Sequence, residues 1–306
     1  MTAVTAPNAR RATLPALLPA LLGAGLALLA PREAEAQRWT LSYRVHVGGV
    51  AVLDARTELF LAGDRYSVQV DAATDGFLGR MFPWQTQSRS VGAIQADGQL
   101  APSRHSQVST LRGSPRNVTL DYDSTGAVRA QVTPPPQDDD REPVPESLLR
   151  GTLDPLSSVL RVLLAGARGE GCRQSVPVFD GRRRYDMQFA DEGMRMVDAS
   201  RYSVFAGAAR QCRVSHTPIA GYNRKPDGGP FWRRGGGQER RPPVEVWIAP
   251  VTPGGPPLPV RLETDSGFGW VVIHLTGAAM APETAEGPQT ERPSSEMPAK
   301  TVRQAP

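Results

Sequence analysis

Trp39-Thr-Leu-Ser-Tyr-Arg-Val-His-Val47 alternates apolar and polar side chains along its whole length. Alternation with a period of two is typical of a β-strand that has one face buried and the other in water. Gly48-Gly49 follows as a turn, and a second alternating run extends from Val50 to Leu61. The stretch therefore predicts an antiparallel hairpin, and it sets the fold class expected for the rest of the chain.

Similar alternating runs recur along most of the remaining sequence, separated by short turn sequences rich in Gly, Asp and Ser. Before the middle of the chain they are Tyr66–Ala72, Gln85–Ile94, Ser103–Leu111, Asn117–Tyr122 and Ala127–Val132. After it they are Arg173–Phe179, Arg184–Ala190, Met194–Tyr202, Gln211–Ile219, Val244–Ile248, Leu258–Asp265 and Trp270–Thr276. The pattern predicts an all-β, mainly antiparallel protein of about a dozen strands.

One helix is predicted within this series, over Asp154–Gly166. Asp154 suits the N-cap, Pro155 suits the first helical position, and Gly166 suits the end. The apolar side chains that recur at helical spacing are Leu156, Val159, Leu160, Leu163 and Leu164. Because this stripe must be buried, we expect a curved sheet or half-open barrel, with the helix covering one mouth or one face.

The N-terminus has the organisation of a secretory signal peptide. Arg10 and Arg11 precede an apolar run from Ala12 to Ala30, and Ala34-Glu35-Ala36 forms a small-residue cleavage site. We expect residues 1–36 to be removed, which predicts a periplasmic protein with no membrane span after cleavage. The alternative is an uncleaved membrane anchor, which prolines in and after the run disfavour.

The exported part is expected to form a single β-rich domain over residues 37–280. Two segments rich in proline and charge, residues 133–145 and 224–243, read as surface loops inserted between strands. Residues 281–306 have few apolar side chains and are predicted to be a disordered tail.

The chain has two cysteines, Cys172 and Cys212. Redox-active pairs usually sit as C-x-x-C, whereas a disulfide between distant cysteines is typical of exported proteins. We therefore expect a structural disulfide between Cys172 and Cys212, with a redox pair as the alternative.

Charge and motifs exclude several functions. The formal net charge is only +4, from 35 basic and 31 acidic residues, which does not indicate nucleic-acid binding. No nucleophile elbow, zinc-protease motif, P-loop or dinucleotide-binding motif is found, so neither an enzyme nor a cofactor is expected. The four histidines, each isolated in its own strand, predict no metal site; they are His46, His105, His216 and His274.

Two further features have both a structural and a functional interpretation. Phe77, Leu78, Met81, Phe82 and Trp84 cluster in a stretch without clear periodicity. The cluster reads as a loop covering the core or as an exposed apolar lip that contacts a ligand or a membrane. The triplet Arg182, Arg183 and Arg184 reads as a solvated face or as a site for an anionic group.

Several motifs, taken in order, resemble the DUF3108 family of exported bacterial proteins, whose function is unknown. They are Tyr43-x-Val45-x-Val47-Gly48-Gly49-Val50, Asp75-Gly76-Phe77-Leu78, Asp97-Gly98-x-Leu100-x-Pro102, Leu153-Asp154-Pro155-Leu156-Ser157, Val178 to Tyr185, Val246-Trp247-Ile248 and Leu258 to Glu263. The resemblance implies an envelope protein with a curved antiparallel sheet, similar to half-barrel lipoprotein carriers. It implies no activity and no catalytic residue.

The best functional hypothesis from the sequence is non-catalytic binding or carrying of a hydrophobic or amphiphilic envelope ligand, such as a lipid. The expected cavity lies between the sheet and the apolar face of the helix, unless Trp39, Trp247 and Trp270 fill it. The residues expected to line the cavity or its entrance are Phe77, Phe82, Trp84, Leu156, Leu160 and Leu163. The alternatives are a structural or assembly factor that binds another envelope protein and, third, an unrecognised enzyme.

Overall fold

The computed structural model describes residues 36–135, 142–222, 242–266 and 269–281. The predicted signal peptide, except Ala36, and parts of the two predicted loops lie outside these residues. The predicted tail also lies outside them, except Ala281, which is the last residue of a strand.

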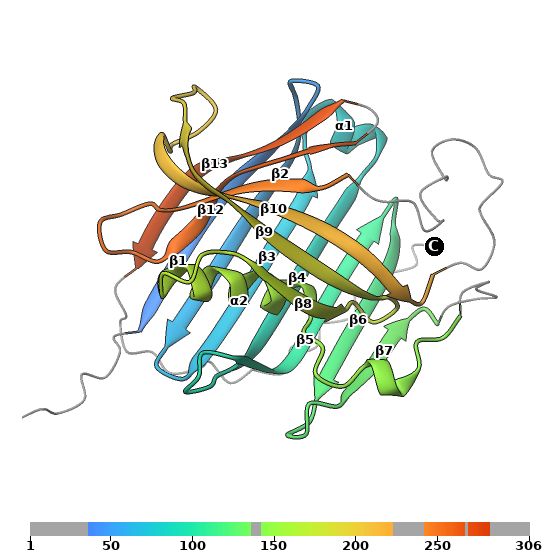
Figure 1. The fold of residues 1–306 in the computed structure, drawn as a ribbon. Coiled ribbons are helices and arrows are strands. Elements are labelled where there is room, and N and C mark those ends of the chain that lie inside the picture. Colours follow the sequence, from blue (N-terminus) through green and yellow to red (C-terminus); the bar gives the residue numbers. More distant parts are fainter. Residues whose placement is uncertain (1–35, 136–141, 223–241, 267–268, 282–306) are drawn as a thin grey trace, which may run out of the picture. The chain divides into compact units, whose positions relative to one another are not determined.

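Within the described residues, thirteen strands form one sheet (Figure 1). The first seven are β1 (Gln37–Val47), β2 (Val50–Ala62), β3 (Arg65–Thr74), β4 (Trp84–Ile94), β5 (Leu100–Leu111), β6 (Ser114–Tyr122) and β7 (Val128–Thr133). The other six are β8 (Gln174–Phe179), β9 (Arg184–Val197), β10 (Gly207–Ala220), β11 (Val244–Pro250), β12 (Pro257–Asp265) and β13 (Trp270–Ala281).

The sheet joins two meanders. Strands β1–β7 follow one another in space as they do in sequence, and so do β8–β13. Antiparallel pairing of β1 with β13 connects the two series, which leaves β7 and β8 as the two edges. The prediction of a mainly antiparallel all-β protein is therefore confirmed.

The hairpin that decides the fold class forms as its sequence predicts. Val47 pairs with Val50 across the turn. Gly48 and Gly49 have φ angles of 55° and 87°, a conformation that side chains with a Cβ rarely adopt. The turn therefore depends on both glycines, and it fixes which face of β1 is buried.

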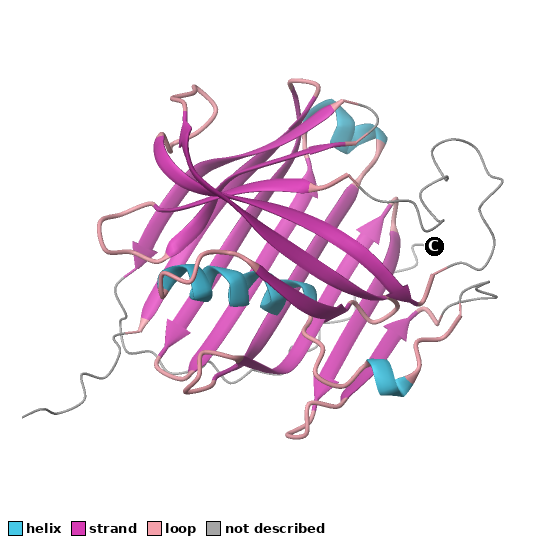
Figure 2. Cartoon of the chain, in the orientation of Figure 1, coloured by secondary structure: helices cyan, strands magenta, loops and turns pink. Residues whose placement is uncertain are grey.

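The predicted helix is α2 (Pro155–Ala167), and it lies inside the curl of the sheet. It contacts β4 and β5 from the first meander and β8 and β12 from the second. Figure 2 shows it running across the strands, with β8–β10 passing in front of the first meander. No helix in the described part of the chain is long and apolar enough to cross a membrane.

Side chains fill most of the space around α2. Trp39, Leu41 and Leu275 from β1 and β13 are at most 2% exposed, and they belong to the same apolar core as Leu160 of α2. Trp247 is partly buried against this core, whereas Trp270 is 62% exposed. Burial of these side chains is the main force that holds the helix against the sheet.

The structure corrects one strand prediction. Residues 184–190 and 194–202 were expected as separate strands, but Arg184–Val197 forms the single strand β9, paired with β10. Gly193 has a φ of 83° at a register shift between the two strands. The glycine therefore serves a β-bulge within a continuous strand, where the sequence indicated a turn.

Two short helices were not predicted. The apolar stretch after β3 contains α1 (Gly76–Met81), and η1 (Glu146–Leu148) precedes α2. Both are too short to show a helical period, which explains why the sequence pattern did not reveal them.

Candidate functional site

A largely apolar hollow of about 500 Å³ opens at the C-terminal end of α2. We call it the helix-end pocket. Val162 and Leu164 of α2 line it together with Leu61 of β2, Ile248 of β11 and Met194 of β9. Met194 is 54% exposed, so the pocket opens to solvent on that side. Its size lies within the range of small-molecule sites, about 300–1,000 Å³.

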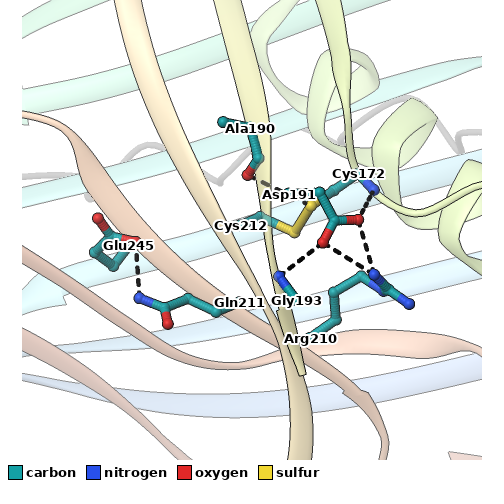
Figure 3. Close-up of a disulfide and its surroundings, with 8 residues drawn as sticks. All are labelled: Cys172, Ala190, Asp191, Gly193, Arg210, Gln211, Cys212 and Glu245. Atoms are coloured by element: carbon teal, nitrogen blue, oxygen red, sulfur yellow. Dashed lines mark hydrogen bonds and ion pairs between the residues drawn. A yellow bond between two sulfur atoms is a disulfide. The ribbon is translucent and has the colours of Figure 1, made fainter. Parts of the chain in front are cut away.

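One wall of the helix-end pocket is anchored by the disulfide between Cys172 and Cys212, shown in Figure 3. The bond joins the segment after α2 to β10, with a Cα–Cα distance of 6.2 Å. Both cysteines are at most 1% exposed, and Cys172 also lines the pocket. The predicted structural disulfide is therefore confirmed, and it fixes the end of the helix against the sheet.

A partly buried carboxylate lies beside the disulfide. Asp191 accepts hydrogen bonds from Nη1 of Arg210 at 2.9 and 2.8 Å and from the backbone N–H groups of Gly193 and Cys172 (Figure 3). Burial alone would raise the pKa of Asp191, but the two N–H groups and the guanidinium hold it below its usual value. Asp191 is therefore ionised at neutral pH and holds Arg210 in the pocket lining.

Arg210 gives the helix-end pocket its one cationic group among the described residues. Its hydrogen bonds within the described chain use Nη1 only. The remaining guanidinium N–H groups can therefore donate to a ligand. Apolar walls beside a fixed guanidinium suit a molecule with an apolar chain and a polar or anionic end.

A larger hollow of about 730 Å³ lies on the opposite face of the sheet, over β1–β5. Its charged and amide groups already bind one another. Arg44 pairs with Asp54 at 2.7 Å, and Asp71 accepts from the side-chain amides of Gln69 and Gln87. The helix-end pocket is the better candidate for a ligand site because its walls are more apolar and the disulfide braces one of them.

The residues predicted to bind a ligand fall into two groups. Leu160 and Leu163 are 2% and 9% exposed and belong to the closed core, with Leu156 packed against it. Phe77 lies on α1, and Phe82 and Trp84 lie just after it. The structure does not bring the two groups together, and none of these residues lines the helix-end pocket.

The arginine triplet lies in and after the turn between β8 and β9. Arg183 lies 3.9 Å from Asp180, and Arg184 pairs with Asp186 at 2.6 Å. The backbone N–H of Arg182 also donates to Asp180. These contacts stabilise the hairpin turn. Acidic side chains of the same chain lie beside the guanidinium groups of Arg183 and Arg184.

The N-cap of α2 belongs to a buried polar network that the sequence did not reveal. Asp154 Oδ1 accepts from the backbone N–H groups of Leu156 and Ser157, both at 3.0 Å. The same oxygen accepts from Ser90 Oγ at 2.6 Å and lies 3.3 Å from Nδ1 of His105. Ser157 Oγ, at 2.6 Å, donates to the other carboxylate oxygen.

This network does not have the geometry of a catalytic triad. In a triad the two nitrogens of the imidazole face different partners, whereas here Nδ1 of His105 faces both Asp154 and Ser90, the latter at 2.8 Å. All three residues are at most 3% exposed. Burial alone would raise the pKa of Asp154, but His105, Ser157 and Ser90 hold it below its usual value. The network therefore anchors α2 to β4 and β5.

Two of the four histidines do meet. The ring centroids of His46 and His274 lie 5.4 Å apart, and Tyr202 packs against both. Burial, Arg261 and the neighbouring His46 lower the pKa of His274. Among the described residues, no three His, Cys, Asp or Glu side chains gather in a group that could hold a metal ion.

The fold and the pocket together define a class of protein: a curled antiparallel sheet with one helix in its interior and an apolar pocket at the end of that helix. The family model DUF3108, described as a protein of unknown function, matches residues 42–276, and the chain belongs to this family. No curated protein matches the chain. Among solved structures it is similar to the "Beta-barrel-like Protein of Domain of Unknown Function DUF1849 from Brucella abortus", with 11% identity, a TM-score of 0.46 and coverage of 81% of this chain and 99% of that chain.

Proposed function

We propose that this protein is an exported, non-catalytic binding protein of the cell envelope that holds the apolar part of an amphiphile in the helix-end pocket. The observation that carries the proposal is the pocket itself, a hollow of about 500 Å³ with largely apolar walls at the end of α2. A preformed apolar pocket with few polar groups is the usual site of a hydrophobic ligand.

Electrostatics support an amphiphile over a purely apolar ligand. Arg210 is held by Asp191 at the pocket wall, with N–H groups still able to donate. An acidic or phosphate headgroup would find these donors beside the apolar walls that take its chain.

A binding role without catalysis fits the chemistry of the described residues. The one group that places Ser, His and Asp together, at Ser90, His105 and Asp154, is closed to a substrate and lacks a proton relay. Export supports an envelope ligand, because the N-terminal segment has signal-peptide organisation and disulfides persist in oxidising compartments.

One observation favours a second function, a structural or assembly factor. Strand β7 (Val128–Thr133) pairs only with β6, so one row of its backbone groups is open within the described residues. A strand from another envelope protein would extend the sheet at this edge. Binding of a peptide at β7, with no ligand in the helix-end pocket, would favour this function.

Gly166 allows a sharp test of the pocket. A Cβ built at Gly166 would meet only Pro257, at 3.7 Å, which is ordinary contact. Gly166→Leu would thus place a side chain into the pocket lining, and the loss of a helical glycine gains roughly 1 kcal/mol of stability. We expect affinity for a fluorescent fatty acid to fall at least tenfold while the melting temperature is kept or raised.

The matched control is Gly166→Ala, which makes the same gain in helix propensity and fills little of the pocket. Its affinity should stay within about threefold of the original protein. Displacement of the probe by unlabelled fatty acid identifies specific binding. No binding at micromolar protein, or equal binding by the Leu and Ala variants, would refute the proposed function.

A further inference from the structure

Six large apolar side chains are exposed at one end of the strands. We call them the apolar rim: Val50, Phe77, Met81, Phe82, Leu111 and Trp270, which are 42–68% exposed. They lie in or beside four connections, between β1 and β2, β3 and β4, β5 and β6, and β12 and β13. Figure 1 shows α1 at the same end of the sheet as the β1–β2 turn.

The four connections are neighbours and are linked by backbone hydrogen bonds. The N–H of Arg112 donates to the carbonyl of Pro83, which joins the β5–β6 turn to the segment after α1. The N–H of Asp75 donates to Val52, and that of Gly48 donates to Trp270. The rim therefore follows the sheet end from β6 to β12 without interruption.

The opposite end of the same strands has the reverse character. Three of the four turns there contain Asp64, Asp97 and Asp123, all exposed. None of the four contains an exposed large apolar side chain. In a meander alternate turns lie at opposite ends, so the two ends are built by the same strands. The two ends therefore differ in the residues of their turns, which are apolar at the rim and polar at the opposite end. This difference points to a contact made by the rim end only.

Two of the four rim connections are basic, whereas the exposed Asp265 pairs with Trp270 across the β12–β13 connection. Gly76–Trp84 and Leu111–Arg116 contain arginines and no acidic residue. Arg80 and Arg112 are exposed, and the guanidinium of Arg112 lies 4.7 Å from the centre of the Phe82 ring. Asp75, at the start of α1, lies within electrostatic reach of Arg44. Phenylalanine and tryptophan beside arginine is the composition of sites that enter the headgroup region of a bilayer.

The shape of the rim favours lipid over protein. Its six apolar side chains come from four connections, and the polar backbone groups of those connections belong to the same surface. Lipid headgroups and water can fill such gaps and bind the polar backbone groups, whereas a protein partner would need a complementary surface at each turn.

We propose that the apolar rim docks this protein on the surface of an anionic phospholipid bilayer. Phe77, Met81, Phe82 and Trp270 enter the boundary between headgroups and acyl chains, and Arg80 and Arg112 contact lipid phosphates. The proposal is independent of the helix-end pocket, which lies elsewhere on the molecule.

The test is co-sedimentation of the protein, purified from its host, with vesicles of phosphatidylcholine alone or of equal parts phosphatidylcholine and phosphatidylglycerol. We expect binding to the anionic vesicles. The variant Phe77→Ser with Met81→Ser should bind them at least about tenfold more weakly, because two exposed apolar side chains no longer enter the bilayer.

The matched control is Met196→Ser with Met280→Ser. These methionines are 69% and 54% exposed, against 68% and 52% for Phe77 and Met81, but they lie outside the rim. The control should bind like the original protein. All four side chains are exposed, so both double variants should melt at the temperature of the original protein. Equal loss of vesicle binding in both variants would overturn the proposal.

Two further measurements separate the components of the contact. The double variant Arg80→Gln with Arg112→Asn should bind anionic vesicles about fivefold more weakly and lose its preference for them over phosphatidylcholine vesicles. Asparagine is chosen at position 112 because it tolerates the φ of 50° found there. Vesicles should shift the emission of Trp270, which is 62% exposed, to shorter wavelength, and Trp270→Phe should abolish that shift.

A rim-dependent dimer in sedimentation velocity, with no binding to either vesicle, would assign the rim to a second copy of the chain and overturn the proposal. Fatty-acid displacement is measured without vesicles, so failure of membrane docking and failure of the pocket are separate results.

Discussion

At the scale of single residues, the buried carboxylate of Asp154 joins α2 to two strands of the sheet. One carboxylate caps α2, accepts from Ser90 on β4 and lies beside His105 on β5. A buried carboxylate with this many donors is stable because they replace the water it has lost. Asp154 therefore holds the start of α2 to β4 and β5, in addition to the apolar packing of the helix.

We predict that Asp154→Ala lowers the free energy of unfolding by about 3 kcal/mol, because it removes the helix cap and leaves buried donors without an acceptor. Urea unfolding followed by circular dichroism measures the change. Asp154→Asn keeps an acceptor oxygen and should lose less. A loss below about 0.5 kcal/mol in the alanine variant would contradict this role.

The pKa of Asp154 also predicts a dependence on pH. Since its pKa is lower in the folded state than in the unfolded state, its ionised form stabilises the fold above the unfolded pKa of about 3.9. That contribution is lost as pH falls through the folded pKa. The stability difference between the original protein and Asp154→Asn should therefore shrink as the pH falls below about 4. A difference that grows on acidification would exclude this assignment.

The sequence predicted part of this arrangement. An aspartate before Pro155 and an apolar run is a recognisable N-cap, because that signal lies within one helical turn. Ser90 and His105 are separated from Asp154 in sequence by 64 and 49 residues and reach it only through strand pairing and the curl of the sheet. Polar side chains at inward positions of β4 and β5 were the available signal.

At the scale of elements, the disulfide braces the C-terminal end of α2 as Asp154 braces its start. It closes a sequence separation of 40 residues, which contains β8, β9 and the start of β10. Without the bond these strands keep their backbone pairing, but the unfolded chain gains conformational entropy, which lowers the free energy of unfolding.

We predict that Cys172→Ser with Cys212→Ser lowers the free energy of unfolding by about 4 kcal/mol on the chain-entropy estimate. Differential scanning calorimetry of the double variant measures the loss. The original protein under reducing conditions should show a similar loss, whereas unchanged stability in both experiments would show that the bond does not brace the fold.

Strands were predicted correctly where the alternating pattern was long. The prediction was wrong where a glycine fits either a turn or a β-bulge. The alternating runs of β1 and β2 predicted their strands because a buried face imposes a period of two. At Gly193, glycine is compatible with a turn and with a β-bulge, and only the pairing of β9 with β10 shows that a bulge forms. Local sequence carries no information on that pairing.

At the scale of the whole sheet, the two proposed sites differ in how far the sequence could have located them. The apolar rim was within reach, because every second turn of a meander lies at the same end. The helix-end pocket was not, because it requires the curl that brings Ile248 of β11 and Met194 of β9 to Leu164 of α2. Curl depends on summed twist and bulges along thirteen strands.

Strand β1 connects the two ends of this arrangement. It begins at Gln37, in the lining of the helix-end pocket, and ends at Val47, beside the turn that carries Val50 of the rim. Its 11 residues, at about 3.3 Å each, span roughly 35 Å. In a protein docked by the rim with β1 along the bilayer normal, the pocket would lie roughly 35 Å from the headgroups, about the thickness of the hydrocarbon core of a bilayer. A ligand could not slide sideways from the docked bilayer into the pocket, so loading and release would take place across the aqueous gap, facing away from the surface on which the protein rests.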